Sequence, residues 1–559
     1  MQYLAIGHGK IFTVRLEDTP LSAGGQGFIY KISYPYAFSH YCVKLYKTEK
    51  YAKENENRLK YMINNRPVNM KMQKILICWP DYLLYSDTND FVGYMMPLAF
   101  KGSRDLKIIE TYNFNQTIAQ KYPKYESWNK FDYSSEGSFK RRLQMMKNWA
   151  LAVDIIHKTH KYVLVDIKPE NVLATEEGLI SVVDTDSFQI NDGNNVFKGP
   201  VATPEYFAKI AKQIQQQGEL QTTYCDMFAL GVSFYKILTG THPFSGFKLL
   251  PPYDTDEYCN IASHIDAELF AFGSKRQYIE FLTDFNLHER FLDLPIQIKN
   301  LFLRTFNSTI GYPSAEEWVN VIDAYIHKMD VKKPRKFQGV APLMNTEARS
   351  LCVLLFDVSG SMAKSIDAMN DALRAFIENL CLGTGGFSAF SKESVELGII
   401  TFDNRVNIVR QPHLVSSISD APILYVNNGN TNTTAALDTA VDMVEKRKAQ
   451  FKKVGLPYYR PWIVLITDGN PNPYNERDVI HVTSKLHYGI KNKKFLFNAV
   501  GIGEKVDEGF LKYISLDNYI RISRKSFSSM FRTLSCSLNS ISRGYDDINP
   551  LHGLSDIEL

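Results

Sequence analysis

The sequence predicts a multidomain chain in which an α+β body precedes an α/β body with a doubly wound, Rossmann-like sheet. Three observations support this division. The length of 559 residues exceeds what one ordinary core fills, since domains average roughly 150 residues. A basic stretch at residues 329–346 carries two prolines and has no sustained periodicity, which is typical of a linker. Before it, strand-like runs come first and helices later, whereas after it short apolar strands alternate with helices.

The linker fixes the expected boundaries. The expected parts are a first body at residues 1–328, a basic linker at 329–347, a second body at 348–545 and a tail at 546–559. We find no internal repeat and no long low-complexity tract, so each body needs its own interpretation. Residues 248–292 contain a charged insertion, PPYDTDEYCN, to which the sequence assigns no role.

The composition is that of a globular protein, with 45% hydrophobic and 22% charged residues. The net charge of +4 comes from 64 Lys and Arg against 60 Asp and Glu, and it argues against a nucleic-acid binder. No apolar run approaches the ~18 residues that span a bilayer, and the chain does not open like a secretory signal, so we expect no membrane partner. The seven scattered cysteines form no CxxC pair, which favours a reduced, cytoplasmic compartment.

A glycine-rich loop near the start is the first candidate binding element. Gly24, Gly25 and Gly27 lie between two strand-like runs, where glycines let a backbone pass close to a polyphosphate. An ordinary glycine-rich turn explains this segment equally well. A dinucleotide-binding loop is a third option, but such a loop opens a helix, and here the strand-like run FIYKISYPY follows.

A lysine on an apolar strand follows the loop. Lys44 stands in YCVKLY, where a buried lysine must reach solvent or meet an anion. The next stretch is helical and acidic, and it offers Glu54 and Glu56 as ion-pair partners. We expect Glu56 to be the partner, because this choice leaves the apolar residues of ENRLKYM against the core.

Four more polar residues complete a set suited to phosphoryl transfer. A helix at residues 143–157 leads into YVLVDIKPENVL, which holds Asp166, Lys168 and Asn171. Farther on, the apolar strand LISVVD ends in Asp184. Phosphoryl transfer needs positioned phosphates, metal ions and an acceptor hydroxyl held in line, and little covalent help from the protein.

In this order the motifs resemble those of eukaryotic-type Ser/Thr protein kinases over roughly residues 5–325. VATPEY at 201–206, the apolar helix starting at Asp226 and YPSAEEW at 312–318 strengthen the resemblance. It implies a bilobal α+β kinase fold that binds ATP with Mg²⁺ or Mn²⁺ and phosphorylates a protein substrate.

The resemblance also implies a role for each residue. Asp166 accepts the proton of the acceptor hydroxyl, and Lys168 offsets charge on the moving phosphoryl group. Asp226 supports the backbone of the catalytic loop. The remaining implied ligands are Gly24, Gly25, Gly27, Lys44, Glu56 and Met96 for ATP, and Asn171 and Asp184 for the metal.

Departures from the family pattern leave an alternative open. Leu164-Val165 replaces His-Arg, Thr185-Asp186 replaces Phe-Gly, and Lys209-Ile210 replaces Pro-Glu. These changes favour an enzyme that is constitutively assembled or controlled by a partner. The alternative is an inactive pseudokinase that binds nucleotide and acts as a scaffold.

The second body carries a set of oxygen ligands at expected strand ends. The buried strand LCVLLFD ends in Asp357, with Ser359 and Ser361 directly after it. Thr431 precedes a later helix, and Asp468 follows the strand PWIVLIT. A solvated helix cap explains Asp-x-Ser-x-Ser alone, but the later residues favour a hard-oxygen site for Mg²⁺ or Mn²⁺.

These five residues match the metal-ion-dependent adhesion site of von Willebrand factor A domains. The resemblance implies that an acidic protein partner completes the metal shell with a carboxylate. Kinase and adhesion-type domains in one chain are similar to bacterial TerY-like pairings in tellurium-resistance and stress-response clusters, which also include a metal-dependent phosphatase. We therefore expect a protein kinase whose second domain recruits an acidic partner. A third option is a metal-dependent assembly module with the kinase fold as its stalk.

Overall fold

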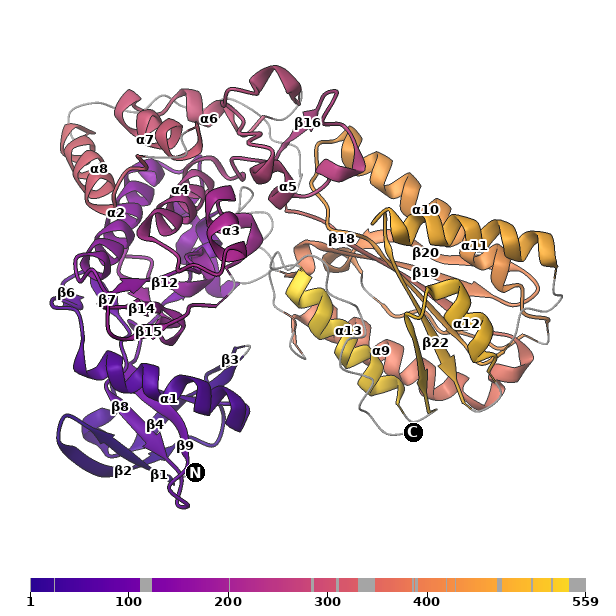
Figure 1. Cartoon of the computed structure of the whole chain (residues 1–559), viewed down its shortest axis with the longest axis horizontal. Coiled ribbons are helices and arrows are strands. Elements are labelled where there is room, and N and C mark those ends of the chain that lie inside the picture. Colours follow the sequence, from indigo (N-terminus) through magenta and orange to yellow (C-terminus); the bar gives the residue numbers. More distant parts are fainter. Residues whose placement is uncertain are drawn as a thin grey trace. The chain divides into compact units, whose positions relative to one another are not determined.

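A computed structural model of the chain contains two compact units, each with its own sheets and helices (Figure 1). The described residues are 2–24, 26–110, 123–200, 202–282, 286–307, 311–329, 347–384, 387, 391–418, 420–427, 429–469, 475–503, 506–523 and 526–541. Gly25, most of the expected linker and the expected tail lie outside them.

The two units are built from interleaved stretches of the chain. The first comprises residues 1–244, 268–276 and 284–344, and the second comprises 245–267, 277–283 and 345–559. The second unit thus includes two segments that precede the expected linker. In this respect the compact units differ from the bodies expected on the sequence.

The first unit begins with a seven-stranded antiparallel sheet in the order β2-β1-β8-β9-β5-β4-β3. The strands are β1 (Gln2–Gly7), β2 (Lys10–Leu16), β3 (Ser22–Ala23), β4 (Gly27–Tyr34), β5 (Tyr41–Tyr46), β8 (Tyr82–Tyr85) and β9 (Phe91–Pro97). One face buries an apolar core that includes Ala5, Val43 and Met95. Helix α1 (Glu49–Asn64) packs against β5, β8 and β9. Because Lys44 stands on β5, this sheet fixes its position.

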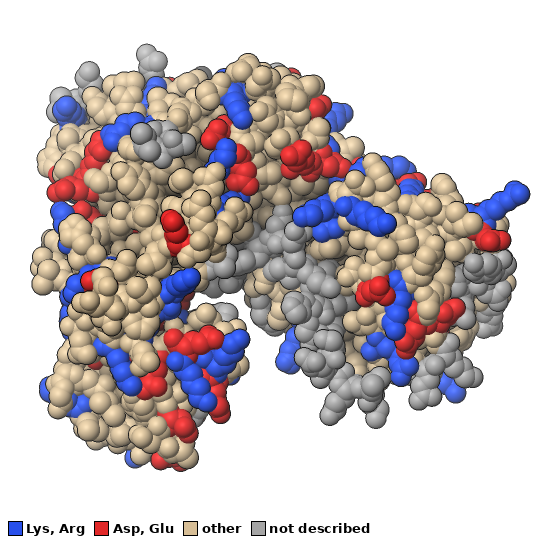
Figure 2. Space-filling model, viewed as in Figure 1, with Lys and Arg blue, Asp and Glu red and all other residues tan. Residues whose placement is uncertain are grey.

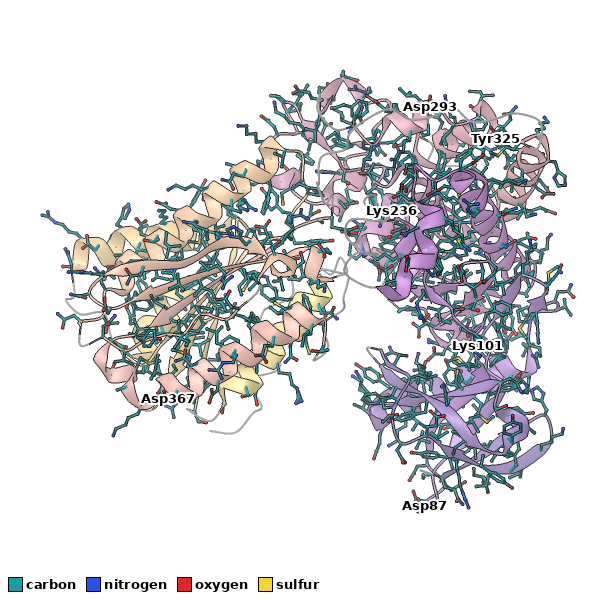
Figure 3. All side chains as sticks on the ribbon, turned by 180° about the vertical axis from the view of Figure 1, so that it is seen from behind. Asp87, Lys101, Lys236, Asp293, Tyr325 and Asp367 are labelled. Carbon is teal, nitrogen blue, oxygen red and sulfur yellow. The ribbon has the colours of Figure 1, made fainter. Side chains whose placement is uncertain are left out.

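The rest of the first unit is mainly helical. Its helices are α2 (Ser138–His157), α3 (Lys209–Gln216), α4 (Thr223–Thr239), α6 (Glu289–Leu292), α7 (Ile296–Asn307) and α8 (Ala315–Met329). α4 is mainly apolar and is buried from Cys225 to Thr239, as such a sequence predicts. α2 packs against α4 and α8. Seen from behind, Lys236 lies among these helices, whereas Asp87 lies at the far end of the seven-stranded sheet (Figure 3).

Two short sheets carry the segment that holds the expected catalytic residues. One has the order β10-β12-β13-β7-β6 and the other β11-β14-β15. Their strands are β6 (Lys71–Met72), β7 (Ile75–Ile77), β10 (Arg104–Asp105), β11 (Tyr162–Val163), β12 (Val172–Ala174), β13 (Ile180–Val182), β14 (Gln189–Asn191) and β15 (Val196–Phe197). β12 and β13 form an antiparallel pair, so the residues before β12 and after β13 lie at the same end.

The second unit is built on a six-stranded sheet in the order β20-β19-β18-β21-β22-β23. The strands are β18 (Ser350–Asp357), β19 (Val395–Phe402), β20 (Val406–Leu414), β21 (Trp462–Thr467), β22 (Leu496–Ile502) and β23 (Tyr519–Ile522). β20 is antiparallel to its neighbour, and the other neighbouring pairs are parallel. Every residue of β18, β19 and β21 is buried, which explains their continuous apolar runs.

Helices cover both faces of this sheet (Figure 1). They are α9 (Ile366–Leu382), α10 (Thr433–Lys453), α11 (Glu476–Lys491), α12 (Glu508–Ser515) and α13 (Phe527–Ile541). Residues of α10, α11 and α12 share one apolar cluster with Leu351 and Val353 of β18. On the other face Phe531 of α13 packs against Phe376 of α9 and Phe356 of β18. Because β19, β18, β21, β22 and β23 run parallel, their carboxyl ends lie at one edge of the sheet.

The charged insertion forms part of the second unit. The segments of the second unit around it, residues 245–267 and 277–283, contain β16 (Phe247–Leu249), α5 (Ile261–Asp266) and β17 (Ile279–Phe281), and β16 pairs with β17. The backbone N–H of Tyr458 donates to the carbonyl oxygen of Cys259 at 2.9 Å. Asp256 forms ion pairs with Lys448 (3.1 Å) and Lys452 of α10. These contacts give the insertion a structural role.

Charges of both signs are interspersed over the visible face of each unit in Figure 2, in keeping with the small net charge. Among the described residues, the structure has no helix long and apolar enough to cross a bilayer.

Candidate functional site

The loop with the expected catalytic residues joins β11 to β12, and a buried aspartate fixes its backbone. Asp226, at the start of α4, accepts hydrogen bonds from the N–H groups of Leu164 (2.8 Å) and Val165 (2.8 Å). His157 Nε2 lies 2.8 Å from the same carboxylate. Val165 has a φ of 66°, which a β-branched residue adopts only where surrounding contacts impose it. Asp226 therefore occupies the supporting place that the resemblance implies.

Asp166 is oriented by two neighbours, one of which sequence reasoning missed. Its Oδ1 accepts hydrogen bonds from the backbone N–H (3.0 Å) and the hydroxyl (2.8 Å) of Thr203. Lys168 Nζ lies 2.7 Å from Asp166 Oδ2 and donates to Thr203 Oγ1 at 2.9 Å. The structure thus brings Asp166 and Lys168 together. The motif VATPEY was the available signal for Thr203.

Asn171 directly precedes β12 and Asp184 follows β13, so both residues lie at the same end of this antiparallel pair. Asn171 Nδ2 donates to the carbonyl oxygen of Asp166 at 2.9 Å, and the Val183 N–H donates to the Asn171 carbonyl at 3.0 Å. Asp184 follows at a φ of 59°, a left-handed conformation, and leads into a short turn at residues 185–187. A small cavity lined by Asp166, Asn171 and Val183 lies between these segments.

Lys44 reaches this turn from β5. Its Nζ lies 2.6 Å from Asp184 Oδ1 and 2.8 Å from Asp186 Oδ1. Burial alone would lower the pKa of Lys44, but the carboxylates of Asp186 and Asp184 outweigh it and raise that pKa above its usual value. Lys44 is therefore a buried, fully charged ammonium. The Lys44 ammonium also lowers the pKa of Asp184.

The expected pairing of Lys44 with Glu56 is not formed, and this corrects the sequence-based assignment. Glu56 Oε1 lies 2.7 Å from Lys60 Nζ and accepts a hydrogen bond from the Tyr85 hydroxyl at 2.9 Å. Glu54 is exposed to solvent. The reason is the phase of the helix. The buried residues of α1 are Ala52, Asn55, Leu59, Met62 and Ile63.

Of the glycine loop between β3 and β4, the structure describes Gly24 and Gly27 but not Gly25. The Gly24 N–H donates to the Gly27 carbonyl oxygen at 2.9 Å. A Cβ at Gly27 would lie 2.6 Å from the Leu45 carbonyl oxygen, so only glycine fits against β5 there. Met96 lies on β9 opposite Cys42 and is almost fully buried. Contacts of this loop with phosphate and of Met96 with adenine stay predictions.

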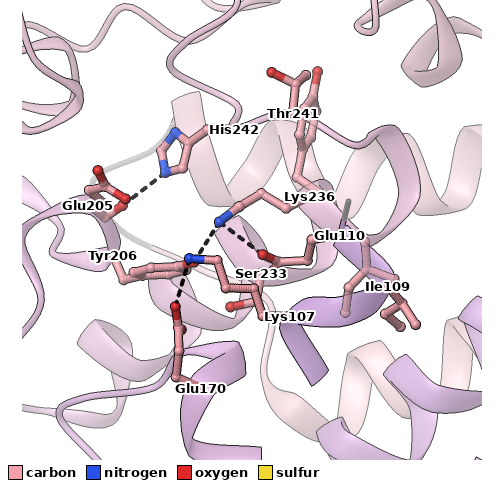
Figure 4. A network of polar contacts seen from close by, with 12 residues as sticks. Lys107, Ile109, Glu110, Glu170, Glu205, Tyr206, Ser233, Lys236, Thr241 and His242 are labelled. Carbon is pink, nitrogen blue, oxygen red and sulfur yellow. Dashed lines mark hydrogen bonds and ion pairs between the residues drawn. The ribbon is translucent and has the colours of Figure 1, made fainter. Parts of the chain in front are cut away.

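A charged network lies beside the catalytic loop (Figure 4). Lys107 Nζ is 3.1 Å from Glu170 Oε1, and Lys236 Nζ is 3.0 Å from Glu110 Oε2. Lys236 also donates to the Tyr206 hydroxyl at 2.8 Å. Burial alone would raise the pKa of Glu170, but the nearby lysines outweigh it and lower that pKa. Tyr206, which follows Thr203, thus bonds α4 directly, whereas Glu170 binds Lys107 in the short turn at residues 106–110, whose Glu110 pairs with Lys236 of α4.

The five expected metal ligands of the second unit meet at one edge of the six-stranded sheet. Asp357 ends β18 and Asp468 follows β21, and these strands are parallel neighbours. Ser359 and Ser361 lie in the turn after β18. Ser361 Oγ donates to Asp468 Oδ1 at 2.6 Å and lies 3.0 Å from Ser359 Oγ. Thr431 lies just before α10, in the third loop at this edge.

Gly469 marks a space into which the oxygen atoms face. A Cβ built there would lie 3.7 Å from both Ser361 Oγ and Thr431 Oγ1, and 3.9 Å from Asp357 Oδ2. Burial raises the pKa of Asp357, and a divalent cation is the charge that would favour its ionised form. In the described part of the chain, no three His, Cys, Asp or Glu side chains gather as a metal site. A donor set of two carboxylates and three hydroxyls is of the kind that fits Mg²⁺ or Mn²⁺.

Two family descriptions match separate parts of the chain. Residues 104–269 match the protein kinase domain family, and residues 352–534 match the von Willebrand factor type A domain family. The first match contains the loop with the expected catalytic residues and Asp184, and the second contains all five expected metal ligands.

Several serine/threonine-protein kinases are similar to part of the chain. The serine/threonine-protein kinase mrck-1 of Caenorhabditis elegans is 28% identical over 189 residues, which are 33% of this chain and 11% of the worm protein. The human serine/threonine-protein kinase MRCK beta is 35% identical over 122 residues, covering 21% of this chain and 7% of the human protein. The Drosophila melanogaster serine/threonine-protein kinase Genghis Khan is 34% identical over 106 residues, covering 18% and 6%. The chain spans about a tenth of the length of the worm and rodent relatives that it matches.

Proposed function

Because the chain joins a protein kinase domain to a von Willebrand factor type A domain, we propose that it is an ATP-dependent serine/threonine protein kinase that recruits an acidic protein partner through a metal site. The observation that carries the kinase assignment is the Asp166–Lys168–Thr203 group beside the Lys44–Asp184 pair. This combination of a held carboxylate, a neighbouring ammonium and a second carboxylate on a strand end suits phosphoryl transfer.

The residues divide the chemistry as follows. Bound ATP with Mg²⁺ or Mn²⁺ supplies the phosphoryl group. Lys44 binds the phosphates next to it, and Asn171 with Asp184 would hold the metal. Asp166, oriented by Thr203, accepts the proton of the acceptor hydroxyl, and Lys168 offsets charge on the moving phosphoryl group.

Loss of the acid–base group tests the kinase proposal. We expect wild-type protein to transfer radiolabelled phosphate from ATP to itself or to a generic protein substrate, and Asp166→Ala and Lys44→Ala to lose at least about a hundredfold in rate. Asp87→Ala is the matched control, because Asp87 is an exposed carboxylate in the same unit. Equal transfer by all variants would refute the assignment. Nucleotide binding without transfer by the wild type would instead support the scaffold.

The metal proposal concerns the second unit. We propose that Asp357, Ser359, Ser361, Thr431 and Asp468 bind Mg²⁺ or Mn²⁺ and leave a position for a carboxylate of an acidic protein. The contacts among these residues and the space beside Gly469 support this assignment.

A metal titration tests the site without needing the partner. We expect Mn²⁺ to bind the full-length protein and Asp357→Ala to abolish binding at this site, as followed by calorimetry with nucleotide absent. Asp367→Ala, an exposed aspartate in the first turn of α9, is the control. Captured partner should also be released by a chelator. Unchanged Mn²⁺ binding in a folded Asp357→Ala variant would contradict the proposal.

The biological setting rests on the resemblance alone. We propose a role in bacterial stress or tellurium-resistance-type signalling in the cytoplasm, with a metal-dependent phosphatase as the opposing enzyme. Dephosphorylation of the autophosphorylated chain by a phosphatase that co-purifies with it would support this setting.

A further inference from the structure

The buried ammonium of Lys44 is held between two carboxylates that both come from the turn after β13. Asp184 and Asp186 lie 2.6 Å and 2.8 Å from Lys44 Nζ. Neither comes from α1, whose Glu56 is paired with Lys60. The partner of this lysine is therefore supplied by the same turn that supplies a candidate metal ligand.

The two carboxylates differ in how much they are enclosed. The side chain of Asp184 is 45% exposed, as a group that faces a metal or a nucleotide must be. The side chain of Asp186 is only 2% exposed. Its Oδ1 binds Lys44, and its Oδ2 accepts a hydrogen bond from the Tyr46 hydroxyl at 2.8 Å. Both oxygens of Asp186 are thus occupied by β5, and neither is directed to a ligand.

Helix α1 reaches the same turn by a different contact. Arg58 Nη1 donates to the backbone carbonyl of Asp186 at 3.0 Å and to Asn55 Oδ1 at 3.1 Å. Arg58 Nη2 donates to the Lys198 carbonyl. Helix α1 therefore contacts the backbone of Asp186 and of Lys198 through Arg58. A glutamate on this helix would instead contact Lys44 directly.

We propose that Asp186 is the positioning residue for Lys44 and takes the role that the family resemblance assigns to a helix glutamate. The inference rests on the proposed function, since the place of Lys44 matters where nucleotide phosphates bind. Asp184 remains available for the metal because the enclosed Asp186 fixes the lysine independently. A buried lysine ammonium without an enclosed carboxylate beside it would be strongly unfavourable. Because the buried face of α1 carries Asn55 and no glutamate, Asp186 supplies that carboxylate.

A consequence is that the lysine and the candidate metal ligand move as one. Asp184 and Asp186 share a single short turn, and Arg58 links that turn to α1. A displacement of α1 reaches Lys44 through the backbone of Asp186. In this chain, helix position and metal-ligand position are therefore coupled through one segment.

Nucleotide affinity tests the proposal with the full-length protein. We expect Asp186→Asn, which keeps the shape of the side chain, to weaken binding of a fluorescent ATP analogue with Mg²⁺ by about tenfold. In a Lys44→Met background the same substitution should change the affinity by less than about twofold, because its effect passes through the lysine. Glu56→Gln is the matched comparison and should leave the affinity at the wild-type value.

Other variants separate positioning from folding. Tyr46→Phe frees Asp186 Oδ2 but keeps both carboxylates, and we expect an intermediate loss of affinity; it carries the test if Asp186→Asn does not fold. Wild-type affinity in Asp186→Asn, or an equal loss in both backgrounds, would overturn the proposal. A wild-type chain that binds nucleotide but transfers no phosphate would refute the kinase function and leave the role of Asp186 standing. A wild-type chain that binds no nucleotide would overturn both.

Discussion

Thr203 shows how one buried hydroxyl organises the candidate active site. It is 2% exposed, and its Oγ1 donates to Asp166 while accepting from Lys168. Since a carboxylate can rotate between several hydrogen-bonding positions, these bonds select one of them. The hydroxyl thereby fixes the distance between the proton acceptor and the neighbouring ammonium.

Replacing this hydroxyl by a methyl group gives the first prediction. Thr203→Val keeps the volume and the backbone N–H bond to Asp166 but removes the O–H bond, so we expect kcat to fall about tenfold. The KM for ATP should change little, because no phosphate contact is removed. Steady-state kinetics of the full-length protein measure both values. Thr203→Ser keeps the hydroxyl and is the control; an equal loss in Thr203→Ser would argue against the orienting role.

At the residue level, the sequence predicts ligands that follow strands and misses partners that depend on tertiary contacts. Asp184 and Asp357 could be found because each ends an apolar run. Asp186 could not be assigned to Lys44, because 142 residues separate the two and no local pattern joins them. Thr203 meets Asp166 across 37 residues in the same way.

At the scale of single elements, the phase of α1 explains the one assignment that the structure corrects. The apolar positions of the helix repeat through Ala52, Leu59 and Met62, and Asn55 lies on that face. Glu54 and Glu56 lie on either side of it. The spacing of three and four residues could have excluded both glutamates, but the expectation of a family glutamate outweighed it. The ends of β18 and β21 are easier to predict. A strand that is buried on both faces is a continuous apolar run, so it ends where polar residues begin.

The contact between the insertion and α10 is the second element-level feature. Asp256 lies near the last turn of α10 and is surrounded by Lys448, Lys452 and Lys494. Burial alone would raise the pKa of Asp256, but Lys452 and Lys448 outweigh it and lower that pKa to about 2. A carboxyl group whose pKa is lower in the folded protein than in the unfolded chain stabilises the fold only while it is ionised.

This contact gives a prediction on pH. Asp256 should contribute about 1–2 kcal/mol to the stability of the second unit at pH 7. The contribution is complete above the unfolded pKa of about 4 and is lost as the pH falls towards 2. Urea unfolding should therefore show Asp256→Asn destabilised at pH 7, with a smaller difference from wild type at pH 3. Glu257→Gln, at the neighbouring exposed position, is the control. A difference that does not shrink at low pH would contradict this account.

At the scale of the whole molecule, the order of segments in the sequence does not match the order of compact units. The length, the linker and the two motif sets predict two bodies, and the structure has two units. The assignment of residues 245–267 to the second unit could not be predicted, because the contacts of Asp256 with α10 and Tyr458 join positions about 200 residues apart. Residues 277–283 join the same unit through the pairing of β17 with β16. Charge and proline content alone describe such a segment as a surface loop.

The last prediction follows from this organisation. A fragment of residues 347–541 contains the whole six-stranded sheet but lacks Asp256, and it leaves Lys448, which is 3% exposed in the full chain, with Glu445 as its remaining acidic neighbour. We expect the fragment to unfold at a lower temperature than the second unit of the full-length protein. Lys448→Met should lower the free energy of unfolding of the second unit in the full chain by about 1–2 kcal/mol, because it breaks the ion pair with Asp256. In the fragment this ion pair is absent and water can reach Lys448, so the same substitution should change the free energy of unfolding by less than about 0.5 kcal/mol. Chemical unfolding of both proteins measures these free energies. An equal loss in both proteins would mean that the ion pair with Asp256 does not stabilise the second unit.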